Sequence, residues 1–450
     1  MQRIKKKEGS SVIMGATQIA LGGLIAKVIG ALYRIPLTNL IGGEGIGLYQ
    51  LVYPFYCVLL TVSATGIPSS IATLIAKRKE AGEALQPLFQ TCMRLFLCIG
   101  GVSTVLMVAL APVLSRAQGE SGLTAGYIAL APSVLLVSAI SVFRGYFQGQ
   151  SNMLPTALSE IIEQVVKVGV GLLVAYLFRG NVYRAVTALL FAVTVSELVA
   201  LLFLYIRFRR SPAPDKSLKM GEKIRAKSVL KLSIPVTLSA SLIPLFSLVD
   251  SILIVRLLGA YSDNAVTLYG LFSGGAVTVI NLPVSVCYGI AAASVPALSA
   301  AVGRGESGRK RLLYSLGLTL LLSAVAAVGL YFFAEIAVRL LFRSLAATEL
   351  SALTALVKTF AVSAVTLSCT QTLAACLTAL EKPALAALSM ALAMSVKTLL
   401  NILLLRTPEI SIYGAAWAAN VGYAVSFLLD FLFALWATRR KARAKRLKVA

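Results

Sequence analysis

Long apolar segments recur along the whole 450-residue chain and constrain its fold more than any other feature. Each has about 20 residues or more, the length of helix that crosses a hydrocarbon layer about 30 Å thick. Backbone in lipid must satisfy its own hydrogen bonds, so these segments are expected to be helices, and the short alternating segments of a membrane barrel are absent. With 58% hydrophobic and 13% charged residues, the chain has too few charges for the surface of a soluble protein. An all-α polytopic membrane protein is predicted.

About twelve spans are predicted, six on each side of a polar, basic connection. The expected domains are an N-terminal six-helix lobe at 1–206, a basic cytoplasmic connection at 207–228, a C-terminal six-helix lobe at 229–436 and a basic cytoplasmic tail at 437–450. The predicted spans are 11–35, 46–75, 88–112, 124–147, 154–178, 185–206, 229–257, 266–299, 311–334, 351–379, 383–405 and 411–436.

The two predicted lobes resemble each other weakly. Leu48-Tyr49 near the start of the second span is matched by Leu268-Tyr269 near the start of the eighth, and spans five and eleven both begin with proline. Corresponding helices enter from the same side, which predicts a parallel repeat about an axis along the membrane normal. Transporters built in this way place their substrate in a central cleft between the lobes.

The basic residues predict the orientation of the chain. Of the 42 Lys and Arg, 29 lie at the predicted inner ends of the spans and eight in the outer loops. Both termini are therefore expected on the cytoplasmic side of a bacterial cell membrane. The net charge of +24 would suggest nucleic acid in a soluble protein, but no aromatic residues are interleaved with these charges. The expected partners of the loops are anionic membrane lipids.

Groups for catalysis or metal binding are scarce. The six cysteines all lie in apolar segments without a C-x-x-C pair, and the chain has no histidine. A disulfide framework is not expected, and neither a metal site nor a cofactor is predicted. No nucleophile–base pattern is visible, so the chain is not expected to be an enzyme.

Four lysines inside the predicted spans are the main candidates for a binding site, because ionisable groups at membrane depth are costly. At 1.5 Å per residue, all four lie about 20 Å from the inner face. Two come from each predicted lobe, and together they would make a cationic site for an anionic cargo if they face one cavity. They are Lys27, Lys167, Lys358 and Lys397.

The alternative is that each lysine extends to the interface or pairs alone. Lys167 is the best case for pairing, because Glu163 precedes it by four residues and Glu160 by seven. Glu163 and Glu160 are therefore candidates for a counter-charge or a proton-coupling group. The membrane acids, which include Glu197, Asp250 and Asp430, are expected to be dispersed.

Glycine and proline residues interrupt several spans. They can let helices bend or let helices pack closely through small residues, and the sequence leaves both open. The hinge candidates are Gly30, Pro54, Pro68 and Pro283.

Several blocks resemble the polysaccharide-export and lipid II flippase-like family of the multidrug, oligosaccharidyl-lipid and polysaccharide exporter superfamily. The resemblance is greatest to its stage V sporulation protein B branch. The most specific blocks are IAKVIGALYRIPL at 25–37, TGIP at 65–68 and FRGYFQG at 143–149. Lys27 matches the basic residue of the family's first helix. The lipid II flippases have an Arg-Asp pair after the glycine of that helix, where this chain reads Tyr33-Arg34.

The resemblance implies a two-lobed transporter that works by alternating access. Its implied cargo is a polyprenyl diphosphate-linked oligosaccharide, a peptidoglycan or polysaccharide precursor moved from the inner to the outer leaflet. Arginines of the lipid II flippases in helices two and eight are replaced here, and two C-terminal helices of many members are missing. The alternative is a cation-coupled small-molecule extruder on the same fold, using a proton or sodium. A sporulation role and a monomeric state are also expected.

Overall fold

The protein is described from a computed structural model that covers residues 2–211, 226–304 and 308–449. Side chains near both ends and at scattered helical positions, Lys27 among them, lie outside this description. Every regular element within it is helical. The helices group into two compact units, and each is described by itself.

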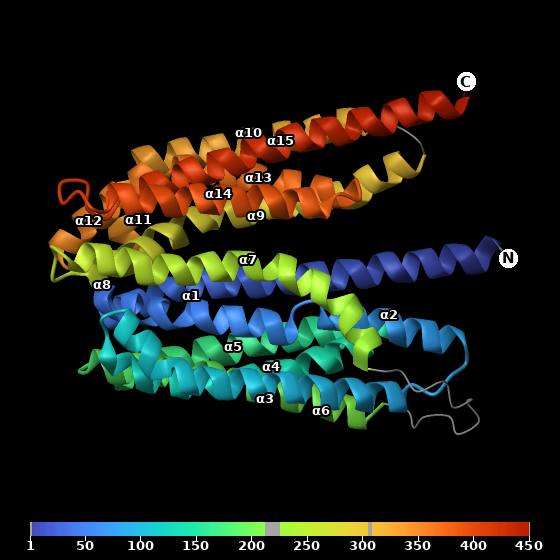
Figure 1. Cartoon of the computed structure of the whole chain (residues 1–450), viewed down its shortest axis with the longest axis horizontal. Helices are drawn as coiled ribbons and strands as arrows, with labels where there is room; N and C mark the ends of the chain where they lie inside the picture. The colour runs from blue at the N-terminus through green and yellow to red at the C-terminus, as the bar shows by residue number, and fades with distance from the viewer. Residues whose placement is uncertain (1, 212–225, 305–307, 450) are drawn as a thin grey trace. The chain divides into compact units, whose positions relative to one another are not determined.

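Unit 1 comprises Met1–Tyr33 and Leu51–Leu245. In this unit α4 packs against α2, α3 and α6, and α5 packs against α6, as Figure 1 shows. Its elements are both ends of α1 (Gln2–Ala64), α2 (Ile67–Glu80), α3 (Gln86–Ala117), the 3₁₀ turn η1 (Ser121–Leu123), α4 (Thr124–Gly149), α5 (Leu154–Leu177), α6 (Val182–Arg209) and the first part of α7 (Ala226–Gly259).

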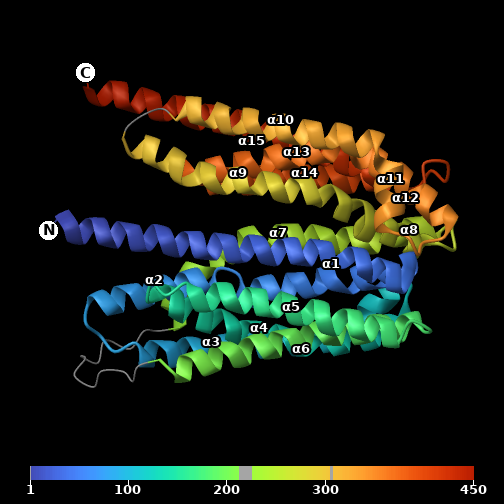
Figure 2. The same cartoon turned by 180° about the vertical axis from the view of Figure 1, so that it is seen from behind.

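Unit 2 comprises Arg34–Gln50 and Phe246–Ala450. Here α13 packs against α9, α10 and α15, and α14 packs against α15, which is visible from behind in Figure 2. Besides parts of α1 and α7, it contains α8 (Ala265–Gly270), the π-helical turn η2 (Leu271–Ala276), α9 (Val277–Gly303), α10 (Arg309–Phe332), α11 (Ala334–Leu341), α12 (Ala347–Phe360), α13 (Val362–Ala379), α14 (Pro383–Leu404) and α15 (Tyr413–Val449).

The predicted all-α membrane fold is confirmed, with ten helical segments in the described residues long and apolar enough to cross a membrane. This number is smaller than the predicted twelve for two reasons. The first two predicted spans fall within one segment, Val28–Glu80. The fifth predicted span corresponds to α5, which is long enough but carries three charged residues, Glu160, Glu163 and Lys167, and is not among the ten.

The compact units differ from the predicted lobes in two respects. Residues Arg34–Gln50 of α1 belong to unit 2, and the division in α7 falls between Leu245 and Phe246 instead of at the basic connection. Side-chain contacts explain the first difference, because the amide of Asn39 donates to the carbonyl of Leu341 at 2.7 Å. Most of the predicted connection at 207–228 lies outside the described residues.

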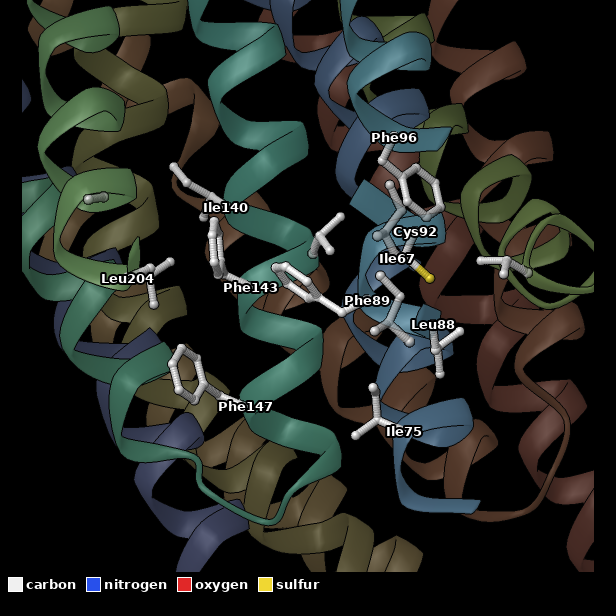
Figure 3. Close-up of a cluster of buried hydrophobic side chains, with 14 residues drawn as sticks. Ile67, Ile75, Leu88, Phe89, Cys92, Phe96, Ile140, Phe143, Phe147 and Leu204 are labelled. Carbon is white, nitrogen blue, oxygen red and sulfur yellow. The ribbon is translucent and has the colours of Figure 1, made fainter. Parts of the chain in front are cut away.

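A hydrophobic core of unit 1 forms where α2, α3, α4 and α6 meet. Ile67 and Ile75 from α2, Phe89 from α3 and Phe143 from α4 are buried side chains of this cluster, which Figure 3 shows. The rings of Phe89 and Phe208 stack with their centroids 4.6 Å apart. Such aromatic pairs add packing energy in a site where lipid supplies no hydrophobic driving force between helices. In unit 2 a corresponding cluster includes Leu312, Leu373 and Leu377.

Most of the hinge candidates do not lie where the long helices are interrupted. In α1 the non-helical residue is Gly42, with φ 72° and ψ −177°, whereas Gly30 and Pro54 lie in helical stretches. Only glycine adopts such a φ without a steric cost. Pro68 lies in the first turn of α2, two residues after Gly66 at φ 77°. Pro283 lies inside α9, after the π-helical turn η2.

Candidate functional site

The candidate lysines are distributed over both units. Lys167 lies on α5 of unit 1, whereas Lys358 on α12 and Lys397 on α14 belong to unit 2. The side chain of Lys27 lies outside the described residues. Arg34 is in unit 2 and is half-buried. That all four lysines face one cavity stays a prediction.

In unit 1 Glu163 pairs with Arg144 on α4. The guanidinium Nη2 of Arg144 lies 3.1 Å from Oε2 of Glu163, and its Nε donates to the hydroxyl of Ser159 at 2.9 Å. Both side chains are largely buried, with 14% and 17% exposed. The structure therefore differs from the Glu163–Lys167 pair weighed from the sequence. The i, i+4 spacing brings those two residues to one face of α5, but the rigid guanidinium fork of Arg144 makes the ion pair.

A second carboxylate belongs to the same cluster. Glu197 on α6 is 4% exposed, and Tyr56 hydrogen-bonds to it. It interacts electrostatically with Glu163, Arg144 and Lys167. Its Oε2 has no hydrogen-bond partner among the described residues. The membrane acids are thus less dispersed than predicted, because the packing of α4, α5 and α6 brings two of them together.

Glycines of α1 face α5 closely. A Cβ on Gly22 would lie 2.7 Å from the Cβ of Ala157, and a Cβ on Gly30 would lie 3.2 Å from Oε1 of Gln164. Small residues allow such close approach of membrane helices. This contact favours close packing, one of the two roles that the sequence left open for Gly30.

In unit 2 Lys397 forms a buried ion pair with Asp250. The ammonium Nζ lies 2.5 Å from Oδ2 of Asp250, and the amide of Asn401 donates to Oδ1 at 3.0 Å. The two charged side chains are 12% and 8% exposed. The pair joins α7 to α14, and nothing in the spacing of the residues predicted it, because the two lie 147 positions apart. This arrangement matches the alternative that the sequence left open, a lysine that pairs alone.

Lys167 and Lys358 differ from Lys397. Both are half-buried, and neither forms a salt bridge with a residue that the structure describes. Lys167 interacts with Glu197 only as a longer-range charge.

Residues 12–302 of the chain match the family described as polysaccharide biosynthesis protein, about two thirds of the chain. The chain belongs to this family. The comparison agrees with the resemblance seen in the sequence blocks.

Two curated relatives come from Bacillus subtilis (strain 168). Stage V sporulation protein B is 28% identical over 93% of this chain and 82% of its own length. The lipid II flippase MurJ is 24% identical over 54% of this chain and 49% of its own.

Solved structures establish the fold. An inward-facing multidrug resistance MATE family transporter of the MOP superfamily has a TM-score of 0.75 and 16% identity, over 92% of this chain and 95% of that one. A MOP superfamily transporter from Pyrococcus furiosus has a TM-score of 0.68 and 16% identity, with 95% and 96% covered. The family and the fold together identify a membrane transporter and not an enzyme.

Proposed function

We propose that the protein moves a polyprenyl diphosphate-linked oligosaccharide from the inner to the outer leaflet of a bacterial cell membrane by alternating access. The observation that carries this proposal is the pair of half-buried lysines, Lys167 on α5 and Lys358 on α12, which form no salt bridge among the described residues. An uncompensated ammonium at membrane depth is costly and is retained where it binds an anion. A diphosphate offers charge-assisted hydrogen bonds to such a group.

The relatives support the class of cargo. One is named as a flippase of lipid II, and the family is described by polysaccharide biosynthesis. The orientation with both termini in the cytoplasm is part of the same proposal. Arg34 and Lys27 remain further candidates for the same cargo, and a role in sporulation is proposed from stage V sporulation protein B.

Neutralising Lys167 and Lys358 tests the proposal. We expect Lys167→Gln and Lys358→Gln each to lower the initial rate of transport by about tenfold to 100-fold, because each removes a charge-assisted hydrogen bond to phosphate. The measurement uses proteoliposomes with a fluorescent polyprenyl diphosphate saccharide and a membrane-impermeant quencher. Arg94→Gln is the matched control, because Arg94 is a basic residue of a membrane helix with an exposed side chain. Wild-type rates in both lysine variants would contradict the proposal.

A second function is favoured by the carboxylates of unit 1. Glu163 and Glu197 interact with each other, and Glu197 keeps an unpartnered oxygen. Such a group can take up a proton or help to hold a sodium ion, which suits a cation-coupled transporter. On this alternative the cargo is a small molecule and the coupling cation supplies the energy.

Glu197→Gln separates coupling from cargo binding. We expect the variant to lose the acceleration that a proton or sodium gradient gives, while transport without a gradient continues, because the amide keeps an acceptor for Tyr56 but cannot ionise. The initial rate is measured with and without each imposed gradient. Glu44→Gln, at an exposed position, serves as the control. A gradient response equal to wild type would exclude Glu197 as the coupling group.

A further inference from the structure

A groove lies between α9 and α10 of unit 2. None of the residues proposed for cargo binding or coupling lines it. Its volume is about 650 Å³. The two helices pack against each other. The residues that line the α9–α10 groove are Gly289, Ile290, Ala293 and Ser294 from α9, and Lys310, Arg311, Tyr314, Ser315 and Leu318 from α10.

One end of the groove is cationic. Lys310 and Arg311 are both exposed and lie in the first turn of α10. This turn contains no acidic residue, and the preceding Gly308 provides no side-chain cap for the backbone amides. Two basic side chains and the positive end of a helix dipole therefore favour an anion at this point.

The rest of the groove is apolar and open to the outside of unit 2. Tyr314 is 74% exposed and Leu318 is 37% exposed. The hydroxyl of Ser294 donates to the carbonyl of Ile290 at 2.6 Å, so it is satisfied within its own helix. From Lys310 to Leu318 the groove wall extends about 12 Å along the helix axis. An occupant must thus carry negative charge at one end and hydrocarbon along the remainder.

We infer that the α9–α10 groove binds an anionic phospholipid of the bilayer. The phosphate of its headgroup lies at Lys310 and Arg311, and the glycerol and first acyl carbons lie along Tyr314 and Leu318. Basic residues beside a membrane attract acidic lipids, and the tyrosine ring suits the boundary between headgroups and hydrocarbon. This binding goes beyond the proposed transport, because it concerns a lipid that stays with the protein.

Brominated lipids test the inference in the whole protein. Tyr314→Trp is made in a background in which the two native tryptophans, Trp417 and Trp436, are replaced by phenylalanine. The protein is reconstituted at 0.15 M salt with phosphatidylglycerol or phosphatidylcholine that carries brominated acyl chains. We expect brominated phosphatidylglycerol to associate about fivefold more tightly at this position, and the preference to disappear in Lys310→Gln/Arg311→Gln.

Two further variants keep the result interpretable. Leu318→Trp is a second reporter, so that a poorly folded Tyr314→Trp does not decide the outcome. Arg339→Gln/Arg343→Gln removes two basic residues of α11 and the turn after it, outside the groove, and should leave the preference intact. Equal quenching by both lipids at both reporters would overturn the inference, as would a preference that survives Lys310→Gln/Arg311→Gln. Loss of quenching when a polyprenyl diphosphate lipid is added would make the cargo the occupant instead and also overturn it.

Discussion

Asp250→Asn is expected to lower the free energy of unfolding by about 3–5 kcal/mol, because it leaves the ammonium of Lys397 buried without a counter-charge. Asp250 accepts from two side chains of α14, Lys397 at 2.5 Å and Asn401 at 3.0 Å. The carboxylate thus holds α7 and α14 of unit 2 together. The loss is measured by titration with a denaturing detergent and by thermal unfolding in a mild one.

A double variant separates the pair from its surroundings. In Asp250→Asn/Lys397→Met no buried charge remains, and the new amide can still accept from Asn401. Replacing a buried ion pair by neutral groups is often neutral or stabilising, so most of the loss should be recovered. A double variant as unstable as Asp250→Asn alone would show that the fold needs the charges themselves.

An exposed pair in the same unit is the matched control. Arg339 and Glu335 lie one helical turn apart on α11, with side chains 70% and 58% exposed. Arg339→Gln should change the free energy of unfolding by less than about 0.5 kcal/mol, because water screens such pairs. The contrast between the two pairs isolates the effect of burial.

Gly270→Val is expected to disrupt the packing of unit 2. A Cβ at Gly270 would lie 2.6 Å from the amide nitrogen of Gly47 and would also meet the carbonyl of Gly43. These are backbone atoms of α1, which cannot rotate away as a flexible side chain would. Overpacking at such a site costs about 1–3 kcal/mol or more, and we expect a lower unfolding temperature and a lower yield of monodisperse protein.

Gly317→Ala is the matched control, and its expected effect has the opposite sign. Gly317 lies in α10 of the same unit, and a Cβ there would meet nothing within 4 Å. Alanine favours a helix over glycine by about 1 kcal/mol in water, so the variant should be as stable as wild type or more stable. An unfolding temperature of Gly270→Val equal to that of Gly317→Ala would contradict the close contact of α1 with α8.

The candidate site was only partly predictable from the sequence. The lysines were identified because an ionisable group stands out in an apolar span, and this needs no knowledge of partners. Arg144 was missed as a site residue, since it was counted among the basic residues of the inner ends. Its partner Glu163 is 19 positions away on another helix, beyond any i, i+4 rule. The block FRGYFQG was the only signal that could have drawn attention to it.

The sequence by itself determined that the chain is a helical membrane protein, and it indicated the family. Both follow from local properties, the length of apolar segments and short residue blocks, which do not depend on how the helices pack. Only the tertiary structure decided that Arg34–Gln50 belongs to unit 2 and that Lys397 is neutralised by Asp250. It also decided that Lys167 and Lys358 lack such a partner among the described residues. These outcomes depend on which helix faces meet, and an apolar face of a membrane helix can be either buried against another helix or exposed to lipid.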